Sequence, residues 1–181
     1  LHNVLLIVKK SATDGSCMFD SIAKGLAHIL EHDSSAFGGN SSCSALEAIH
    51  AMTEPMFLRS AICDHLSGPF ADTSLACLQG QSPRCSVVMD YIEHGYPLHD
   101  ADWTPPPTNP KQVSQTISSY EDYVAIMRKK GVCGDEICLA ASADLLGLRH
   151  IVFDTRGYIS QGVIQERQID LSLDIEPENP N

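Results

Sequence analysis

The apolar residues near the start of the chain follow the period of a strand and then that of a helix. Residues 3–8 form a β-branched, apolar run typical of a buried strand, and residues 11–15 supply the turn residues that end it. From Cys17 onward, apolar residues recur at i, i+3, i+4 and i+7, which predicts a helix with one buried face. That face consists of Phe19, Ile22, Ala23, Leu26, Ile29 and Leu30.

Three further segments have the pattern of helices. Residues 53–55 combine an N-cap candidate with a proline in the first turn, and an apolar stripe follows them. The spacing also predicts helices over residues 112–130 and 136–146, the second capped by Asp135 at its start and by Gly147 at its end.

The last part of the chain predicts strands. Residues 149–154 and 158–164 are rich in β-branched and aromatic side chains, and residues 168–175 alternate between apolar and polar. An early helix, a helical middle and late strands predict an α+β fold of papain-like layout, with a small central β-sheet flanked by helices.

The length and composition of the chain predict a single domain and argue against nucleic acid as a partner. The 181 residues suffice for a single domain, and no apolar stretch is long enough for a membrane helix. Twelve basic and 23 acidic residues leave a net charge of −11, which repels phosphate backbones and argues against nucleic acid as a partner. The chain begins with Leu and ends in a Pro- and Asn-rich stretch, so we expect it to be a segment of a longer protein.

The cysteines predict a reducing compartment. Seven cysteines are an odd number, and none are spaced as Cys-x-x-Cys. A zinc set can be drawn from Cys77, Cys85, His94 and His99, but their spacing fits no standard zinc pattern. We therefore interpret these cysteines as scattered structural thiols.

Cys17 is the candidate for chemistry, because it follows a glycine turn at the predicted start of a helix. Backbone N–H groups and the positive end of the helix dipole favour an anion at such a position, so it suits a thiolate nucleophile or an oxyanion. Gly15 lets the backbone approach a substrate closely, and Asp14 can cap the helix or orient a partner group. The alternative is that Cys17 is a small core residue.

Two motifs in this order resemble those of the OTU (ovarian tumour) family of cysteine proteases. Residues 14–23, Asp-Gly-Ser-Cys-Met-Phe-Asp-Ser-Ile-Ala, are similar to the family's nucleophile signature. Residues 123–127, Tyr-Val-Ala-Ile-Met, then 131–137, Gly-Val-Cys-Gly-Asp-Glu-Ile, and the helix that follows resemble its second conserved block. Cys133 stands where the family usually has Trp.

The resemblance implies roles for individual residues. Cys17 would be the nucleophile, and the backbone N–H groups of Asp14, Gly15 and Cys17 would form the oxyanion hole, while Asp14 would also contact the general base. Three consecutive residues would hold the extended C-terminal tail of ubiquitin: Gly134, Asp135 and Glu136. The alternative for these three residues is a plain helix cap.

The general base is the missing part of the predicted triad. The family places a His at the start of a late strand, so we expect the base just beyond Asn181 in the parent protein. His150 is the alternative within this chain, although a structural role is the more usual one for a His in a buried strand.

The resemblance also implies an organisation and a function. A single OTU-like domain would span residues 1–181, with its core in residues 1–33 and 111–181 and a helical insertion lobe over about 34–110 of the kind found in bacterial effectors. The implied activity is that of a deubiquitinase, a thiol protease that hydrolyses isopeptide bonds in ubiquitin or polyubiquitin chains and for which no metal or organic cofactor is expected. It would act in the cytoplasm, or in the host cytosol if it is a secreted effector. The alternatives are an inactive ubiquitin-binding pseudo-protease and another papain-like peptidase or acyltransferase.

Overall fold

The computed structural model describes residues 16–32, 43–95, 117–156, 159–160, 163–164 and 168–175. Six α-helices occur in this part of the chain: α1 (Cys17–His32), α2 (Cys43–Ala51), α3 (Pro55–Leu66), α4 (Pro83–Val87), α5 (Tyr120–Met127) and α6 (Glu136–Leu146). Shorter helical segments are two 3-10 turns, η2 (Pro69–Asp72) and η3 (Ala76–Leu78), and a π-helical segment, η4 (Val88–Glu93). The strands are β1 (His150–Arg156), β2 (Ile159–Ser160), β3 (Val163–Ile164) and β4 (Gln168–Ile175).

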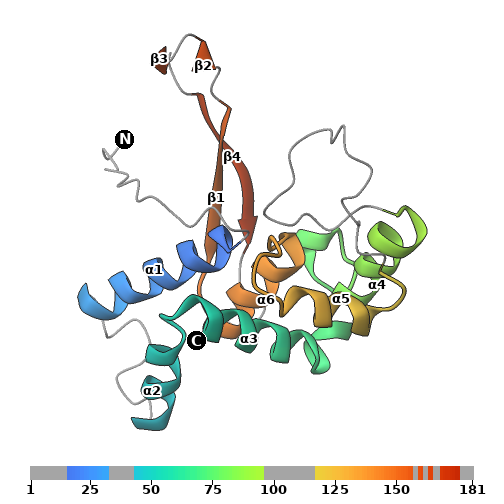
Figure 1. Ribbon diagram of the computed structural model, residues 1–181, viewed down its shortest axis with the longest axis horizontal. Helices are drawn as coiled ribbons and strands as arrows, with labels where there is room; N and C mark the ends of the chain where they lie inside the picture. The colour runs from blue at the N-terminus through green and yellow to red at the C-terminus, as the bar shows by residue number, and fades with distance from the viewer. Residues whose placement is uncertain are drawn as a thin grey trace.

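The prediction of an α+β fold around a central sheet is wrong, because the packed body is helical. The described strands form two separate two-stranded ladders, β1 with β4 and β2 with β3. The β1–β4 ribbon projects from the helices in Figure 1, with β2 and β3 at its far end. Among the strand residues whose side chains are described, Ile175 alone belongs to the buried core. The helices therefore bury their apolar faces against one another and do not flank a sheet.

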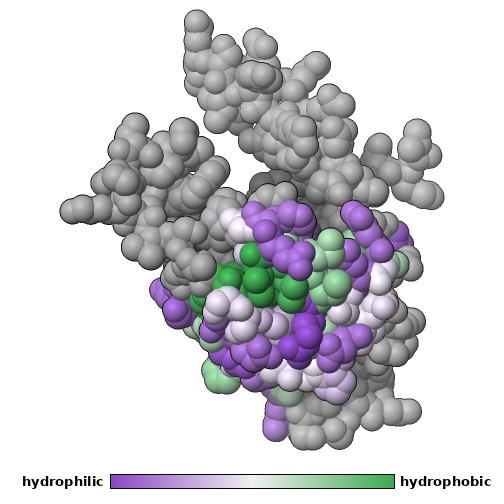
Figure 2. All heavy atoms as spheres, turned by 90° about the vertical axis from the view of Figure 1, so that its right-hand side faces the viewer, coloured by the Kyte–Doolittle hydropathy of each residue, from purple (hydrophilic) through white to green (hydrophobic). Residues whose placement is uncertain are grey.

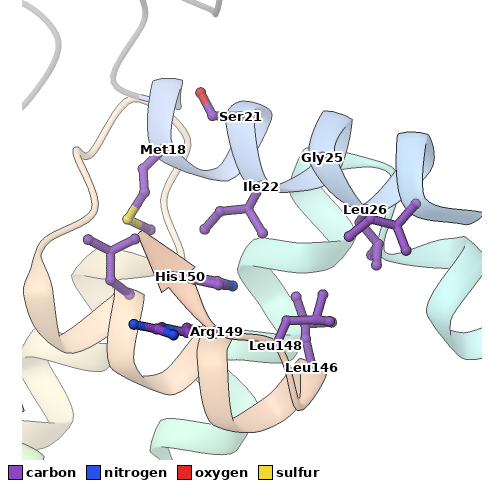
Figure 3. A pocket seen from close by; sticks show the side chains of 11 residues that line it. Met18, Ser21, Ile22, Gly25, Leu26, Leu146, Leu148, Arg149 and His150 are labelled. Carbon is purple, nitrogen blue, oxygen red and sulfur yellow. The ribbon is translucent and has the colours of Figure 1, made fainter. Parts of the chain in front are cut away.

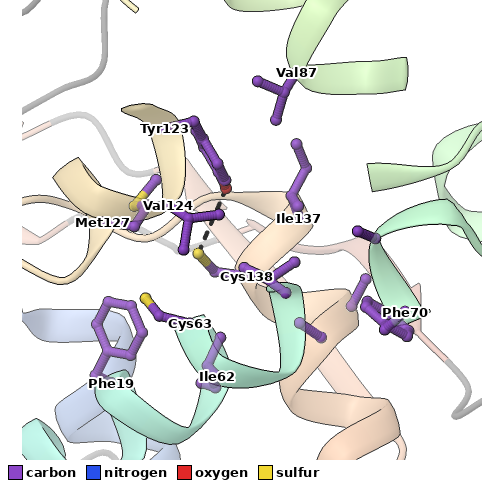
Figure 4. Packing of buried hydrophobic residues seen from close by; sticks show 14 of the residues in the cluster. Phe19, Ile62, Cys63, Phe70, Val87, Tyr123, Val124, Met127, Ile137 and Cys138 are labelled. Atoms are coloured by element: carbon purple, nitrogen blue, oxygen red, sulfur yellow. Dashed lines mark hydrogen bonds between the residues drawn. The ribbon is translucent and has the colours of Figure 1, made fainter. Parts of the chain in front are cut away.

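Helix α3 lies at the centre of this body and contacts α1, α5, α6 and η2. Leu58, Ile62 and Leu66 on α3 are completely buried. Figure 4 shows α3 beside the first turn of α1, with side chains of α5 and α6 covering it. Complete burial of one such side chain stabilises a protein by about 1.5–3 kcal/mol, so α3 is a major contributor to the core.

The helix ends agree in part with the sequence predictions. Asp135 caps α6, Gly147 ends it with a left-handed φ of 62°, and Pro55 opens α3, as predicted. The predicted helix over 112–130 is shorter in its described part, where α5 begins at Tyr120 after the cap Ser119. The predicted strand over 158–164 consists of the short strands β2 and β3, which pair with each other.

Figure 2 shows one face of the molecule, much of which is drawn in grey. Among the coloured residues, hydrophilic ones surround a group of hydrophobic ones that borders the grey atoms. Among the helices described, none combines the length and the apolar character needed to cross a bilayer. The predicted strand over residues 3–8 lies outside the described residues.

Candidate functional site

Cys17 is the first residue of α1, and its side chain is exposed. Ser16 precedes it and is buried, and the Ser16 carbonyl accepts the first helical hydrogen bond, from the Asp20 N–H at 2.8 Å. The first amides of a helix point toward its N-terminal end and have no partner within the helix. Cys17 is therefore an exposed residue at a helix start and not a core cysteine. Asp14 and Gly15, the other predicted oxyanion-hole residues, lie outside the described residues.

The other described cysteines differ from Cys17 in exposure or in position. Burial raises the pKa of the Cys63 thiol to about 11, and burial raises that of Cys138 well above its ordinary value. Both are therefore poor nucleophiles at neutral pH. Cys85 is exposed like Cys17, but it lies inside α4, a helix of five residues, and its N–H donates to the Ser82 hydroxyl at 3.3 Å. Cys85 is thus a matched comparison for the reactivity of Cys17.

A buried arginine fixes the start of α1. Arg59 on α3 is 1% exposed, and its guanidinium lies 3.9 Å from the centroid of the Phe19 ring. Its Nη1 donates to the Met127 carbonyl at 2.7 Å, and its Nη2 donates to the Val132 carbonyl at 2.8 Å. The same Nη2 lies 3.4 Å from the Ser16 hydroxyl. One side chain therefore connects the first turn of α1 with the end of α5 and the loop that follows it.

Gly134 brings the second motif against the first. A Cβ atom at Gly134 would lie 2.2 Å from Cε and 2.6 Å from Sδ of Met18, and 3.2 Å from Cε2 of Phe19. These distances mean that the loop before α6 contacts the first turn of α1 directly. The structure therefore places Gly134 against Met18 and Phe19, the two residues that follow Cys17 in the first motif.

Asp135 has the role of a helix cap. Its Oδ1 accepts hydrogen bonds from the Cys138 N–H at 3.0 Å and from the Tyr123 hydroxyl at 2.9 Å. Its Oδ2 accepts a bond of 2.6 Å from the Tyr91 hydroxyl. Burial raises the pKa of Asp135, whereas these hydrogen bonds act in the opposite direction. The carboxylate is thus engaged in holding α6, α5 and η4 together, which agrees with the cap alternative. Glu136, in the first turn of α6, is exposed.

His150, the predicted alternative base, lies at an apolar groove between α1 and the start of β1. The groove has a volume of about 520 Å³, and Met18, Ile22 and Leu148 are among the residues that line it. Figure 3 shows His150 beneath Met18. The Nδ1 atom of His150 is 3.2 Å from the Ser142 hydroxyl, and burial lowers the pKa of the imidazole. Cys17 does not line this groove, but Met18, the next residue in the sequence, does.

The end of β4 reaches the same region. Ile175, its last residue, pairs with His150 in the β1–β4 ladder and is 1% exposed. Ile175 therefore lies beside a residue that lines the groove. The predicted general base falls beyond Asn181, and the residues after 175 lie outside those described.

No family model matches this chain. Searches of the curated proteins and of the solved structures also find no match. The similarity to OTU proteases is therefore carried by the two motifs alone.

Sequence reasoning missed two features of the site. The sequence does indicate the burial of Arg59, because this charged residue lies one helical turn before Cys63 and shares its buried face of the helix. The hydrogen bonds from Tyr91 and Tyr123 to Asp135 have no such signal, because Tyr91 is 44 residues away from its partner.

Proposed function

We propose that this chain carries the nucleophile of a thiol-dependent hydrolase that cleaves isopeptide bonds at the C-terminus of ubiquitin. The observation that carries the proposal is the exposed Cys17 at the start of α1, whose neighbour in the sequence, Met18, contacts the loop that contains Gly134. A nucleophile needs an accessible thiol next to amides that stabilise an oxyanion, and an exposed cysteine at the first position of a helix supports this role. The similarity to the OTU motifs supplies the choice of ubiquitin as the substrate.

In the proposed reaction the Cys17 thiolate attacks the carbonyl carbon of the isopeptide bond. The C–N bond to the lysine amine breaks, and a protonated imidazole gives its proton to the leaving amine. Water then attacks the thioester, which releases the ubiquitin carboxylate and restores the thiol. We propose that the imidazole belongs to a His after β4 in the parent protein, since the end of β4 lies beside the groove that reaches Met18.

We further propose that the protein acts in a reducing compartment such as the cytoplasm. The sequence has seven cysteines, an odd number, and none are spaced as Cys-x-x-Cys. Free thiols persist in the cytosol, whereas secreted proteins usually carry disulfides.

The test uses ubiquitin that carries an electrophile at its C-terminus, with both this chain and a parent chain that extends past Asn181. We expect covalent capture by the parent chain, its loss in Cys17→Ala, and its retention in Cys85→Ala, which removes a thiol of similar exposure. Noncovalent ubiquitin binding without capture by either chain would favour the pseudo-protease alternative. Cleavage of unrelated peptides without any reaction on ubiquitin would contradict the choice of substrate.

A further inference from the structure

Three potential metal ligands lie together on the exposed surface of α1, near its C-terminal end. His28, Glu31 and His32 are all exposed, and one ligand atom from each lies within 4.8 Å of the others. Residues at i, i+3 and i+4 share one face of a helix, so this proximity follows from the helical backbone itself. The two imidazole rings have their centroids 4.2 Å apart.

A hydrogen bond prepares one of these side chains for metal binding. The Nδ1 atom of His32 lies 3.0 Å from the backbone carbonyl oxygen of His28. Because a carbonyl only accepts, Nδ1 carries the proton in this bond, which leaves the lone pair of the neutral ring on Nε2. Histidines that bind metals in proteins characteristically donate their other N–H in this way, which fixes the ring orientation.

We propose that His28, Glu31 and His32 form a surface site for Zn²⁺. Two imidazole nitrogens and one carboxylate are a ligand set that suits zinc, with Zn–N distances of about 2.0–2.1 Å and water in the fourth position. The negative net charge of −11 favours the approach of a cation. The nearest lysine on this helix, Lys24, is paired with Asp20 at 2.6 Å, which reduces its repulsion of the metal.

The zinc site is separate from the candidate thiol site. Eleven residues separate Cys17 from His28, and a helix rises about 1.5 Å per residue, so the two positions are roughly 16 Å apart along the axis. In Figure 1, α1 runs from the foot of the β1–β4 ribbon to the edge of the molecule. Zinc binding at this site therefore requires neither ubiquitin nor a catalytic Cys17.

The test is a calorimetric titration of Zn²⁺ into the full chain under reducing conditions. We expect one equivalent of bound Zn²⁺ to be lost, or its affinity to fall by about tenfold or more, in His28→Ala and in His32→Ala. Glu31→Gln keeps an oxygen ligand and loses the charge, so a smaller loss is expected. His50→Ala removes an exposed histidine at the end of α2 and should bind Zn²⁺ as tightly as the unsubstituted chain does. Because cysteine thiols also bind zinc, the measured quantity is the difference in Zn²⁺ binding between each variant and the unsubstituted chain.

A second measurement assigns the ligands independently. Histidine-ring NMR spectra should show Zn²⁺-dependent shifts of the His28 and His32 signals, with the His50 signals unchanged. Equal zinc binding by the unsubstituted chain and by the double variant His28→Ala/His32→Ala would overturn the proposal. Ring shifts confined to other histidines would overturn it as well.

Discussion

Replacement of Arg59 by Met should destabilise the protein more than any exposed substitution of the same kind. The change retains much of the buried hydrocarbon volume but removes the donors to the Met127 and Val132 carbonyls, which lie 2.7 and 2.8 Å from the guanidinium nitrogens. It also removes the cation that lies over the Phe19 ring.

The magnitude follows from opposing contributions. A buried carbonyl without a partner costs about 1–3 kcal/mol, so two cost about 2–6 kcal/mol, and the lost cation–π contact adds about 1–2 kcal/mol. Removal of a buried charge recovers part of its desolvation penalty, which amounts to several kcal/mol. We therefore expect a net loss of about 2–4 kcal/mol in the free energy of unfolding.

The assay is urea denaturation followed by circular dichroism, with Arg128→Met as the matched control. Arg128 pairs with Asp64 at 2.6 Å, but 38% of the Arg128 side chain and 68% of the Asp64 side chain are exposed. Exposed ion pairs contribute about 0–1 kcal/mol, so the control should change little. If Arg59→Met unfolds at the same urea concentration as Arg128→Met, the proposed role of Arg59 in holding the start of α1 is wrong.

A local measurement complements the global one. Because Arg59 fixes the first turn of α1, Arg59→Met should alter the rate at which iodoacetamide labels Cys17 under native conditions. The labelling rate of Cys85, on α4, should stay the same. Equal effects at the two thiols would indicate general loosening and would contradict a specific role at α1.

Three further outcomes are expected. Gly134→Ala should lower the melting temperature by an amount equivalent to about 1 kcal/mol or less, because the new Cβ meets the flexible end of Met18, which can shift, and the loss should shrink in a Met18→Ala background. An unchanged loss in that background would show that Met18 is not the obstacle. Tyr91→Phe should cost about 1–2 kcal/mol in urea denaturation, because Asp135 loses its hydrogen bond of 2.6 Å, and a neutral effect would refute that account. Burial lowers the pKa of His150, so the folded state favours the neutral ring: this stability is fully present above the ordinary His pKa of about 6.5 and is lost as the pH falls through the lower folded value. The drop in unfolding free energy between about pH 7.5 and about pH 5.5 should therefore be smaller in His150→Asn, and an equal drop would exclude His150 as a source.

Features that depend on neighbouring residues could be predicted from the sequence. The start of α1 at Cys17 follows from its apolar period, and the ends of α6 follow from Asp135 and Gly147, whose effects are local. The strand over residues 168–175 was also predicted correctly by its alternation. Each of these patterns describes a single element and its buried side.

Features that depend on distant partners could not be predicted in this way. Alternation in β4 indicates a strand but does not say how many strands pair with it, and the described part of the chain gives it β1 alone. The central position of α3 likewise depends on contacts with α1, α5 and α6, which are remote in sequence. An apolar stripe predicts a buried face without naming what covers it.

The position of α3 also limits how the chain can be divided. The sequence prediction assigns residues 34–110 to an insertion lobe, and α3 falls within that range. Yet Arg59 of α3 reaches both motifs, through the Ser16 hydroxyl at 3.4 Å and the Val132 carbonyl at 2.8 Å. Leu58 and Ile62 on the same helix are completely buried in the common core. Any lobe that can be removed without unfolding the candidate site must therefore exclude α3, since the contact between α1 and the Gly134 loop is built upon it.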